Sequence, residues 1–125
     1  MMARVRLLVC VVLLLACGGV GIERACTLIG CLGFLRVDFD TAPSVPFHVT
    51  ALSVSYGEAD FDCADVSTCG PVVFENYTPD QLILTVSTAA GNRQFNLTPA
   101  YTPVYANGPD CGVTCRKATI TAGMP

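Results

Sequence analysis

The sequence predicts an all-β protein: a single antiparallel β-sandwich of about seven short strands, stabilised by disulfides and preceded by an N-terminal signal helix. Three observations lead to this prediction. Apolar and polar residues alternate in several short runs, as they do along a half-buried strand. No apolar pattern with the helical period of 3.6 extends over ten or more positions. Prolines and glycines separate the runs in the way that they punctuate turns.

The first element is an export signal. Arg4 and Arg6 precede ten wholly apolar residues, 7–16 (LLVCVVLLLA). This is the length of a signal-peptide core, whereas a spanning helix needs ~20 apolar residues. We therefore predict a signal peptide over residues 1–16, a Gly-rich tether over 17–30 and a β-sandwich domain over 31–125. An uncleaved anchor is disfavoured because the run is short.

The first half of the domain contains two alternating runs. Residues 32–40 place Leu35, Val37 and Phe39 on one face and Phe34, Arg36, Asp38 and Asp40 on the other, which predicts a strand. Residues 41–46 contain two prolines and form a turn. Residues 47–56 (FHVTALSVSY) alternate again, but their apolar face changes parity near Ala51. A β-bulge at this point would explain the change, because one extra residue flips every side chain that follows.

The second half contains five further short strands, at residues 60–63, 72–75, 81–87, 93–97 and 118–122. Gly91-Asn92 is a hairpin signal between two of them. Residues 99–109 contain three prolines and predict a long crossover without regular structure.

The cysteines predict disulfides rather than a metal site. Six remain when Cys10 is lost with the signal and Cys17 is set apart: Cys26, Cys31, Cys63, Cys69, Cys111 and Cys115. An even number in an exported chain of this size is typical of three disulfides. Fifteen connectivities are possible, and turn-forming residues within two of the close pairs favour Cys63–Cys69 and Cys111–Cys115. A zinc site is disfavoured, because the spacings are not those of a zinc knuckle and an oxidising compartment removes the thiolates.

The segment Leu14-Leu15-Ala16-Cys17 resembles the lipobox at which bacterial lipoproteins are cleaved and acylated. Together with the predicted all-β module and the closing stretch 107–121, it resembles the exported bacterial lipoproteins that carry a small immunoglobulin-like or transthyretin-like sandwich. The resemblance implies acylation of Cys17, a lipid bilayer as partner and a place in the bacterial cell envelope. Gly18 is not the aspartate used for inner-membrane retention, which implies the outer membrane. Ordinary secretory cleavage after Gly18 is the alternative, and it implies a secreted protein.

The excess of acidic residues excludes nucleic acids as partners. After residue 16 the chain has five basic and ten acidic residues, without a basic stripe. An acidic surface repels phosphate backbones, so we expect no nucleic-acid binding.

Few residues are candidates for chemistry. His48 is the only histidine, and no nucleophile motif accompanies it, so we expect a strand histidine rather than a catalytic base. Asp60, Asp62 and Asp65 form an acidic cluster that calcium could use, although a solvated loop is the favoured interpretation. The four tyrosines are either an aromatic binding surface or core-edge packing.

The sequence therefore predicts a non-catalytic structural or interaction module without a catalytic residue or a cofactor. Its protein or glycan partner is not identified by the sequence. A small carbohydrate- or calcium-binding secreted module is the alternative.

Overall fold

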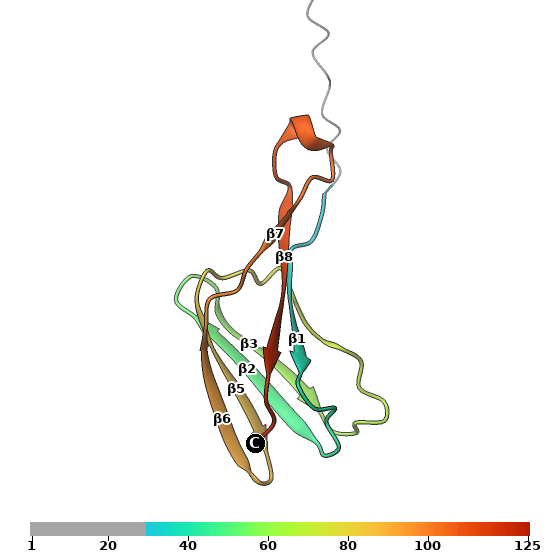
Figure 1. Cartoon of the computed structure of the whole chain (residues 1–125), viewed down its shortest axis with the longest axis vertical. Coiled ribbons are helices and arrows are strands. Elements are labelled where there is room, and N and C mark those ends of the chain that lie inside the picture. Colours follow the sequence, from blue (N-terminus) through green and yellow to red (C-terminus); the bar gives the residue numbers. More distant parts are fainter. Residues whose placement is uncertain (1–29) are drawn as a thin grey trace, which may run out of the picture.

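Two four-stranded sheets face each other in the computed structural model, which describes residues 30–125 (Figure 1). The strands are β1 (Phe34–Phe39), β2 (Phe47–Ser53), β3 (Gly57–Cys63), β4 (Val72–Glu75), β5 (Leu82–Thr88), β6 (Gly91–Leu97), β7 (Thr102–Val104) and β8 (Cys115–Ala122). A 3-10 helix, η1 (Pro109–Cys111), lies between β7 and β8. The all-β prediction is confirmed. The predicted signal helix, Cys17 and Cys26 lie outside the described residues.

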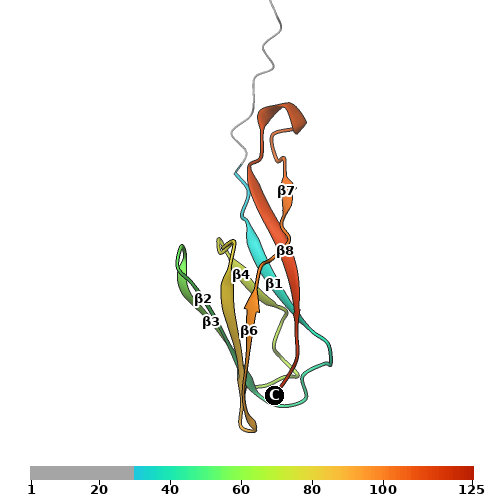
Figure 2. The ribbon, with the colours of Figure 1, turned by 60° about the vertical axis from the view of Figure 1, so that its left-hand side comes forward.

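The first sheet has the order β4-β1-β8-β7, and the second has the order β3-β2-β5-β6 (Figure 2). Neighbouring strands are antiparallel except for β1 and β8, which are parallel from Phe34 opposite Lys117 to Phe39 opposite Ala122. The predicted antiparallel sandwich therefore contains one parallel pair. This pair joins the first and last strands of the domain at the centre of the first sheet.

The core lies between the sheets and follows from the alternation of each strand. Side chains of one parity point inward, as expected from the period of two residues. The buried apolar set is Leu35, Val37, Phe47, Val49, Ala51, Cys63, Val72, Phe74, Tyr77, Leu82, Leu84, Val86, Ala118 and Ala122. Each fully buried leucine or valine contributes roughly 1.5–3 kcal/mol relative to exposure.

The predicted bulge near Ala51 is wrong. Every residue of β2 pairs one-to-one with β3, so the strand keeps a single inward face through Ser53. Ser53 is buried, and its Oγ accepts a hydrogen bond from the Tyr56 N–H at 2.9 Å. Leu52 points outward, and Val54 lies beyond the end of the strand. Ser53 is a polar residue that points inward with its hydrogen bond satisfied, and Leu52 is an apolar residue that points outward. Together they make the sequence look as if the apolar face of the strand had changed.

The predicted strand boundaries differ from the observed ones by two or three residues at β1, β2, β3, β6 and β8, and β7 was not predicted. β3 begins at Gly57, whose φ of 73° permits a tight β2–β3 turn. The predicted crossover contains the short strand β7 and is followed by η1. β8 begins at Cys115, three residues earlier than predicted.

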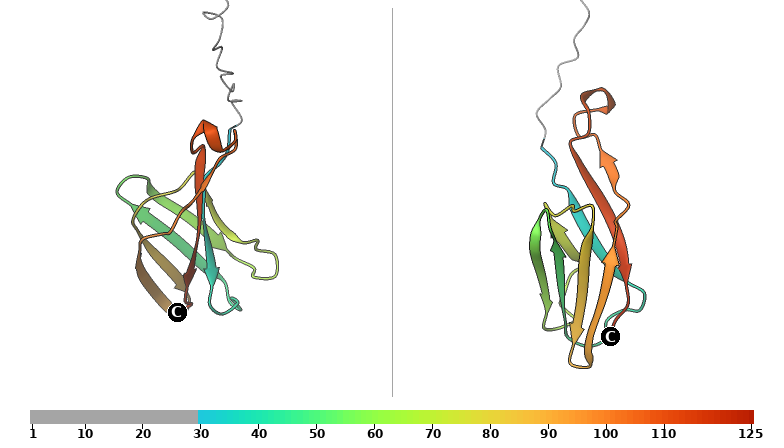
Figure 3. Two further views of the ribbon diagram at one scale, coloured as in Figure 1. Left: turned by 45° about the horizontal axis from the view of Figure 1, so that its top comes forward. Right: turned by 90° about the vertical axis from the view of Figure 1, so that its left-hand side faces the viewer.

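The molecule has two distinct ends (Figures 1 and 3). At the Gly30 end, where the described chain begins, the hairpin of β7 and β8 projects beyond the sandwich and carries η1. The β2–β3 turn lies at the same end of the second sheet. The opposite end carries the β5–β6 hairpin, the β1–β2 connection and the C-terminus. No helix from Gly30 onward is long and apolar enough to cross a membrane.

Candidate functional site

The acidic residues of β3 lie on the solvent face of the second sheet. Glu58, Asp60 and Asp62 alternate with inward residues, so their carboxylates share one side of an edge strand. Charged side chains on an edge strand also oppose edge-to-edge pairing with another chain. The sequence therefore places two of the predicted metal ligands, Asp60 and Asp62, in one row.

His48 lies between these two aspartates on the neighbouring strand. The antiparallel register puts His48 opposite Asp62 and Thr50 opposite Asp60. The Nε2 atom of His48 is 3.0 Å from Asp60 Oδ1, and its Nδ1 atom is 3.4 Å from Asp62 Oδ1. One imidazole thus bridges two carboxylates on an exposed face.

The electrostatics of this cluster favour an ionised Asp60. The Thr50 hydroxyl donates a hydrogen bond of 2.9 Å to Asp60 Oδ1. This bond, together with the smaller contribution of His48, lowers the pKa of Asp60 below its ordinary value. Sequence reasoning singled out His48 and Asp60 separately. It missed Thr50, which only the register of the β2–β3 hairpin reveals.

Asp65, the third predicted metal ligand, lies in the loop after β3 and bonds within that loop. Its Oδ1 accepts hydrogen bonds from the Ser67 hydroxyl at 2.7 Å and from the Ser67 N–H at 3.0 Å. These bonds lower the pKa of Asp65. The side chain closes the turn that leads to Cys69.

The described residues therefore do not assemble the predicted calcium cluster. Asp60 and Asp62 come together, whereas Asp65 is engaged within its own loop. From Gly30 to Pro125, no three side chains of histidine, cysteine, aspartate or glutamate are arranged to hold a metal ion. Calcium binding stays a prediction of the sequence.

The surroundings of His48 also bear on acid–base chemistry. Ser87 lies opposite His48 on β5, so a hydroxyl, an imidazole and a carboxylate occur in one cross-strand row. A general base needs a ring nitrogen free to take the hydroxyl proton. Here both ring nitrogens lie near carboxylate oxygens, Nε2 near Asp60 and Nδ1 near Asp62. The row has the residue types of a hydrolytic triad but not its geometry.

The tyrosines divide into three that pack against the core and one on the surface. Tyr77 is buried in the core, and its hydroxyl donates a hydrogen bond of 2.9 Å to the Gly57 carbonyl. Tyr101 donates one of 2.8 Å to the Pro79 carbonyl, and burial raises the pKa of Tyr101 to about 12. Tyr56 and Tyr105 are exposed, but the ring of Tyr56 meets that of Tyr77 at 5.5 Å and its hydroxyl lies 3.0 Å from Thr78 Oγ1. Core-edge packing thus accounts for Tyr56, Tyr77 and Tyr101, and Tyr105 is left on the surface.

Arg116, which sequence reasoning missed, holds the loop between β4 and β5. Its guanidinium lies over the ring of Tyr101 at 4.2 Å and pairs with Asp80 at 2.9 Å. It also donates a hydrogen bond to the Thr78 carbonyl. The loop crosses from one sheet to the other, so these contacts tie β8 to the second sheet.

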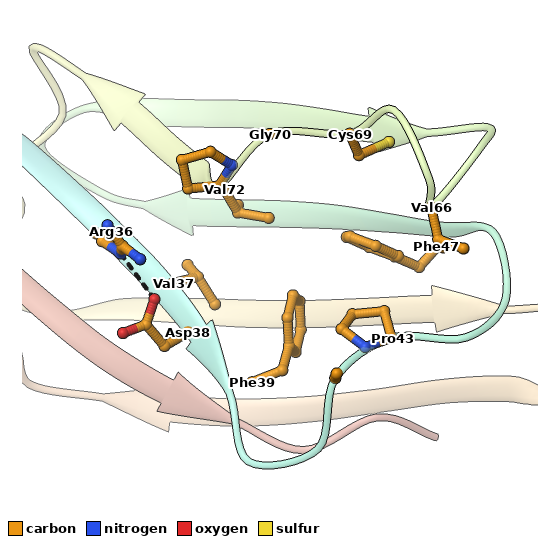
Figure 4. A pocket seen from close by; sticks show the side chains of 12 residues that line it. Arg36, Val37, Asp38, Phe39, Pro43, Phe47, Val66, Cys69, Gly70 and Val72 are labelled. Carbon is orange, nitrogen blue, oxygen red and sulfur yellow. Dashed lines mark hydrogen bonds and ion pairs between the residues drawn. The ribbon is translucent and has the colours of Figure 1, made fainter.

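A hollow of about 260 Å³ opens between the sheets near the start of β2 (Figure 4). Phe39, Phe47 and Val72 line it, and the Cys63–Cys69 disulfide borders it. Arg36 and Asp38 lie along one side, but they pair with each other at 2.7 Å. Ligand pockets usually measure ~300–1,000 Å³ and present convergent polar groups. This hollow has neither property and is an opening at the edge of the core.

The cysteines pair partly as predicted. Cys63–Cys69 is a local bridge, as expected. Cys115 pairs with Cys31 across 84 positions, so the predicted Cys111–Cys115 bridge is wrong. The parallel alignment of β1 with β8 brings the residues before β1 next to the start of β8, which the spacing of the cysteines cannot show. Cys111 is disulfide-bonded as well, so all five cysteines from Gly30 onward are oxidised.

Gly33 permits the close approach of the chains beside the Cys31–Cys115 bridge. A Cβ atom at this position would lie 2.8 Å from the Arg116 carbonyl oxygen, closer than two such atoms can approach. The disulfide and this contact fasten the entry of the domain to β8.

Comparisons with known proteins find no matching family model, no matching curated protein and no matching solved structure. The functional argument therefore depends on the residues and their geometry.

Proposed function

We propose that this protein is a non-catalytic, lipid-anchored module of the bacterial cell envelope, attached through an acylated Cys17 and held at the outer membrane. The observation that carries the proposal is the state of the cysteines. Every cysteine from Gly30 onward is in a disulfide, which is typical of exported proteins and rare in the cytosol. Cys17, which follows a signal core and a lipobox, is the cysteine set apart for acylation.

The geometry of the domain entry suits a tethered protein. Cys31 is bonded to Cys115 at the start of β8, and β8 is a central strand of the first sheet. Force on the chain before residue 31 would therefore reach the middle of a sheet directly, instead of peeling an edge strand.

A structural or interaction role agrees with the surface of the second sheet. Two cross-strand rows of polar side chains run across its solvent face: Asp62, His48, Ser87 and Asn92 in one, and Asp60, Thr50, Thr85 and Gln94 in the other. Such a face offers hydrogen bonds to a protein or a glycan. The engaged nitrogens of His48 argue against a hydrolytic role.

Replacement of Cys17 by serine tests the proposal. We expect C17S to move from the membrane fraction to the soluble fraction and to keep its disulfides and fold, because stable anchoring requires acyl chains. The measurements are membrane fractionation, intact mass and far-UV circular dichroism. A C10S variant is the matched control, because Cys10 lies within the signal core, and it should fractionate like the wild type. Membrane retention of C17S, or an intact mass of the wild type without an acyl increment, would overturn the proposal.

A further inference from the structure

The exposed apolar side chains of the domain gather at the Gly30 end. Of the seven large apolar residues that are exposed in the described part of the chain, six belong to segments at this end: Leu32, Leu52, Val54, Tyr56, Tyr105 and Val113. Leu32 precedes β1, and Val113 precedes β8. The β2–β3 turn contributes Val54 and Tyr56. Only Val45 lies in the β1–β2 connection at the opposite end.

Four of these six residues line two hollows. One, of about 580 Å³, is lined by Leu52 and Val54 together with residues of β5 and β6. The other, of about 350 Å³, is lined by Tyr56 and Val113 and by the Cys31–Cys115 bridge. The β2–β3 turn contributes a different residue to each hollow, Val54 to the first and Tyr56 to the second, so the turn links the two groups of apolar side chains. Soluble domains rarely gather exposed apolar residues in one region without a binding role.

We propose that this region docks on the lipid bilayer to which the protein is anchored. The inference rests on the proposed acylation of Cys17. Residues 18–29 separate Cys17 from the described chain, and even fully extended they reach only ~40 Å. The anchor therefore keeps the Gly30 end close to the membrane. Tethering raises the local concentration of the bilayer around the domain, so that weak apolar contacts suffice for docking.

The chemistry of the region fits the interface of a bilayer. Exposed tyrosines are enriched at the headgroup level, where the ring is apolar and the hydroxyl is hydrated. Tyr105, on the segment between β7 and η1, is exposed in this way. The ring of Tyr56 is partly exposed as well, although its hydroxyl is bonded to Thr78 Oγ1 at 3.0 Å. Glu58 and Asp110 place negative charge at the same end, and Arg116 and Lys117 at the start of β8 place positive charge there, so no strong net charge attracts anionic lipids. Docking depends on apolar contact, and zwitterionic phosphatidylcholine is the appropriate probe.

Tryptophan reporters test the docking directly, because the chain contains no tryptophan. V54W and V113W introduce one reporter into each hollow. V45W is the matched control, because Val45 is also a valine, is 47 % exposed and lies at the opposite end. Each lipidated variant is reconstituted into phosphatidylcholine vesicles with either plain or brominated acyl chains, which quench tryptophan on contact.

We expect all three variants to float with the vesicles. The emission of V54W and V113W should shift to the blue and lose most of its intensity in brominated vesicles, whereas V45W should change little. Flotation without quenching of V54W and V113W would overturn the docking and leave the anchor intact. Failure to float would overturn the anchor and the docking together.

Two further outcomes would also overturn the proposal. Equal quenching of V45W would show that the domain has no preferred orientation at the membrane. A concentration-dependent blue shift of V54W without vesicles, with dimers in analytical ultracentrifugation, would show that a second copy covers the region instead.

Discussion

Thr50 illustrates how one hydroxyl on a strand controls a neighbouring charge. Its hydrogen bond is the largest influence that lowers the pKa of Asp60. Because this pKa is lower in the folded than in the unfolded chain, ionisation of Asp60 stabilises the fold above the unfolded value of ~3.9. The contribution is lost as the pH falls through the folded value of the pKa.

We therefore expect T50V to raise the pKa of Asp60 toward its ordinary value, as measured by NMR titration of the Asp60 side chain. T50V should also be less stable than the wild type at neutral pH in urea unfolding. The difference between the two proteins should begin to narrow as the pH falls below ~4, and it should vanish once the pH is below the lowered pKa of Asp60 in the wild type, where Asp60 is protonated in both.

T85V is the matched control for T50V. Thr85 lies opposite Thr50 on β5 and faces the same side of the sheet, but it makes no contact with Asp60. The pKa of Asp60 should be unchanged in T85V. A similar shift of the Asp60 pKa in T50V and T85V would show that the polar face as a whole, and not the Thr50 hydroxyl, sets the ionisation of Asp60.

Candidate residues were easier to predict from the sequence than their partners. His48 was conspicuous as the only histidine, and the aspartates as the only acidic cluster. Their contacts with each other and with Thr50 depend on a hairpin register that a short alternating run does not specify. Asp65 was grouped with Asp60 by proximity in sequence, although its side chain forms a local turn.

Among the elements, strands with strict alternation were predicted best. β4 was predicted with its observed bounds, and β5 to within one residue at each end. β2 was misjudged because Ser53 is buried through a hydrogen bond with the turn that follows. β7 was missed because Pro103 reads as a break, although a proline is tolerated on an edge strand.

The loop after β3 is held by its own short disulfide, and this allows an element-scale prediction. Cys63 is buried in the core, and Cys69 is six positions away. Closing so short a loop restricts the unfolded chain by about 2 kcal/mol. We expect the double variant C63A/C69A to lose about this free energy of unfolding, because alanine keeps the apolar character of the site. Urea unfolding of the soluble C17S form measures the loss.

V66A is the control for the packing of this loop, because Val66 contacts the core without being bonded covalently. Hydrogen exchange of residues 64–68 separates the two effects. Loss of packing in V66A should speed exchange only next to residue 66, whereas loss of the bond should speed it throughout the loop. If C63A/C69A had the same free energy of unfolding as the parent protein, the Cys63–Cys69 disulfide would not stabilise the fold by restricting the unfolded chain.

At the scale of the whole molecule, the fold class was predictable and the connectivity was not. Alternation shows which residues of a strand point inward, but it does not show which strands are neighbours. The parallel pairing of β1 with β8 joins residues more than 80 positions apart, and the long-range disulfide follows from it. Turn-forming residues near Cys111 favoured a local bridge, but strand order overrode this local preference.

This strand order leads to a prediction for the remaining disulfide. Cys111 is disulfide-bonded, and Cys26 is the sixth cysteine of the set predicted from the sequence. We expect a Cys26–Cys111 bond beside Cys31–Cys115. Non-reducing peptide mapping of the mature protein should join Cys26 to Cys111. A bond from Cys17 to Cys111 would overturn both this pairing and the lipid anchor.

The Cys31–Cys115 bond and the expected Cys26–Cys111 bond would close nearly the same long loop of the unfolded chain, so either bond alone would supply most of the entropic stabilisation. A single bond across 84 positions restricts the unfolded chain by about 4.5 kcal/mol. With the second bond intact, removal of Cys31–Cys115 reopens only a loop of roughly ten residues, and the loss falls to about 2.5 kcal/mol. In the soluble C17S form, C31S/C115S and C26S/C111S should each show this smaller loss in urea. The variant that lacks both bonds should lose about 2 kcal/mol more free energy of unfolding than the summed losses of C31S/C115S and C26S/C111S. The reason is that the long loop is closed in each of those variants and open only when both bonds are absent. Additive losses in this cycle would mean that the two bonds do not enclose the same loop.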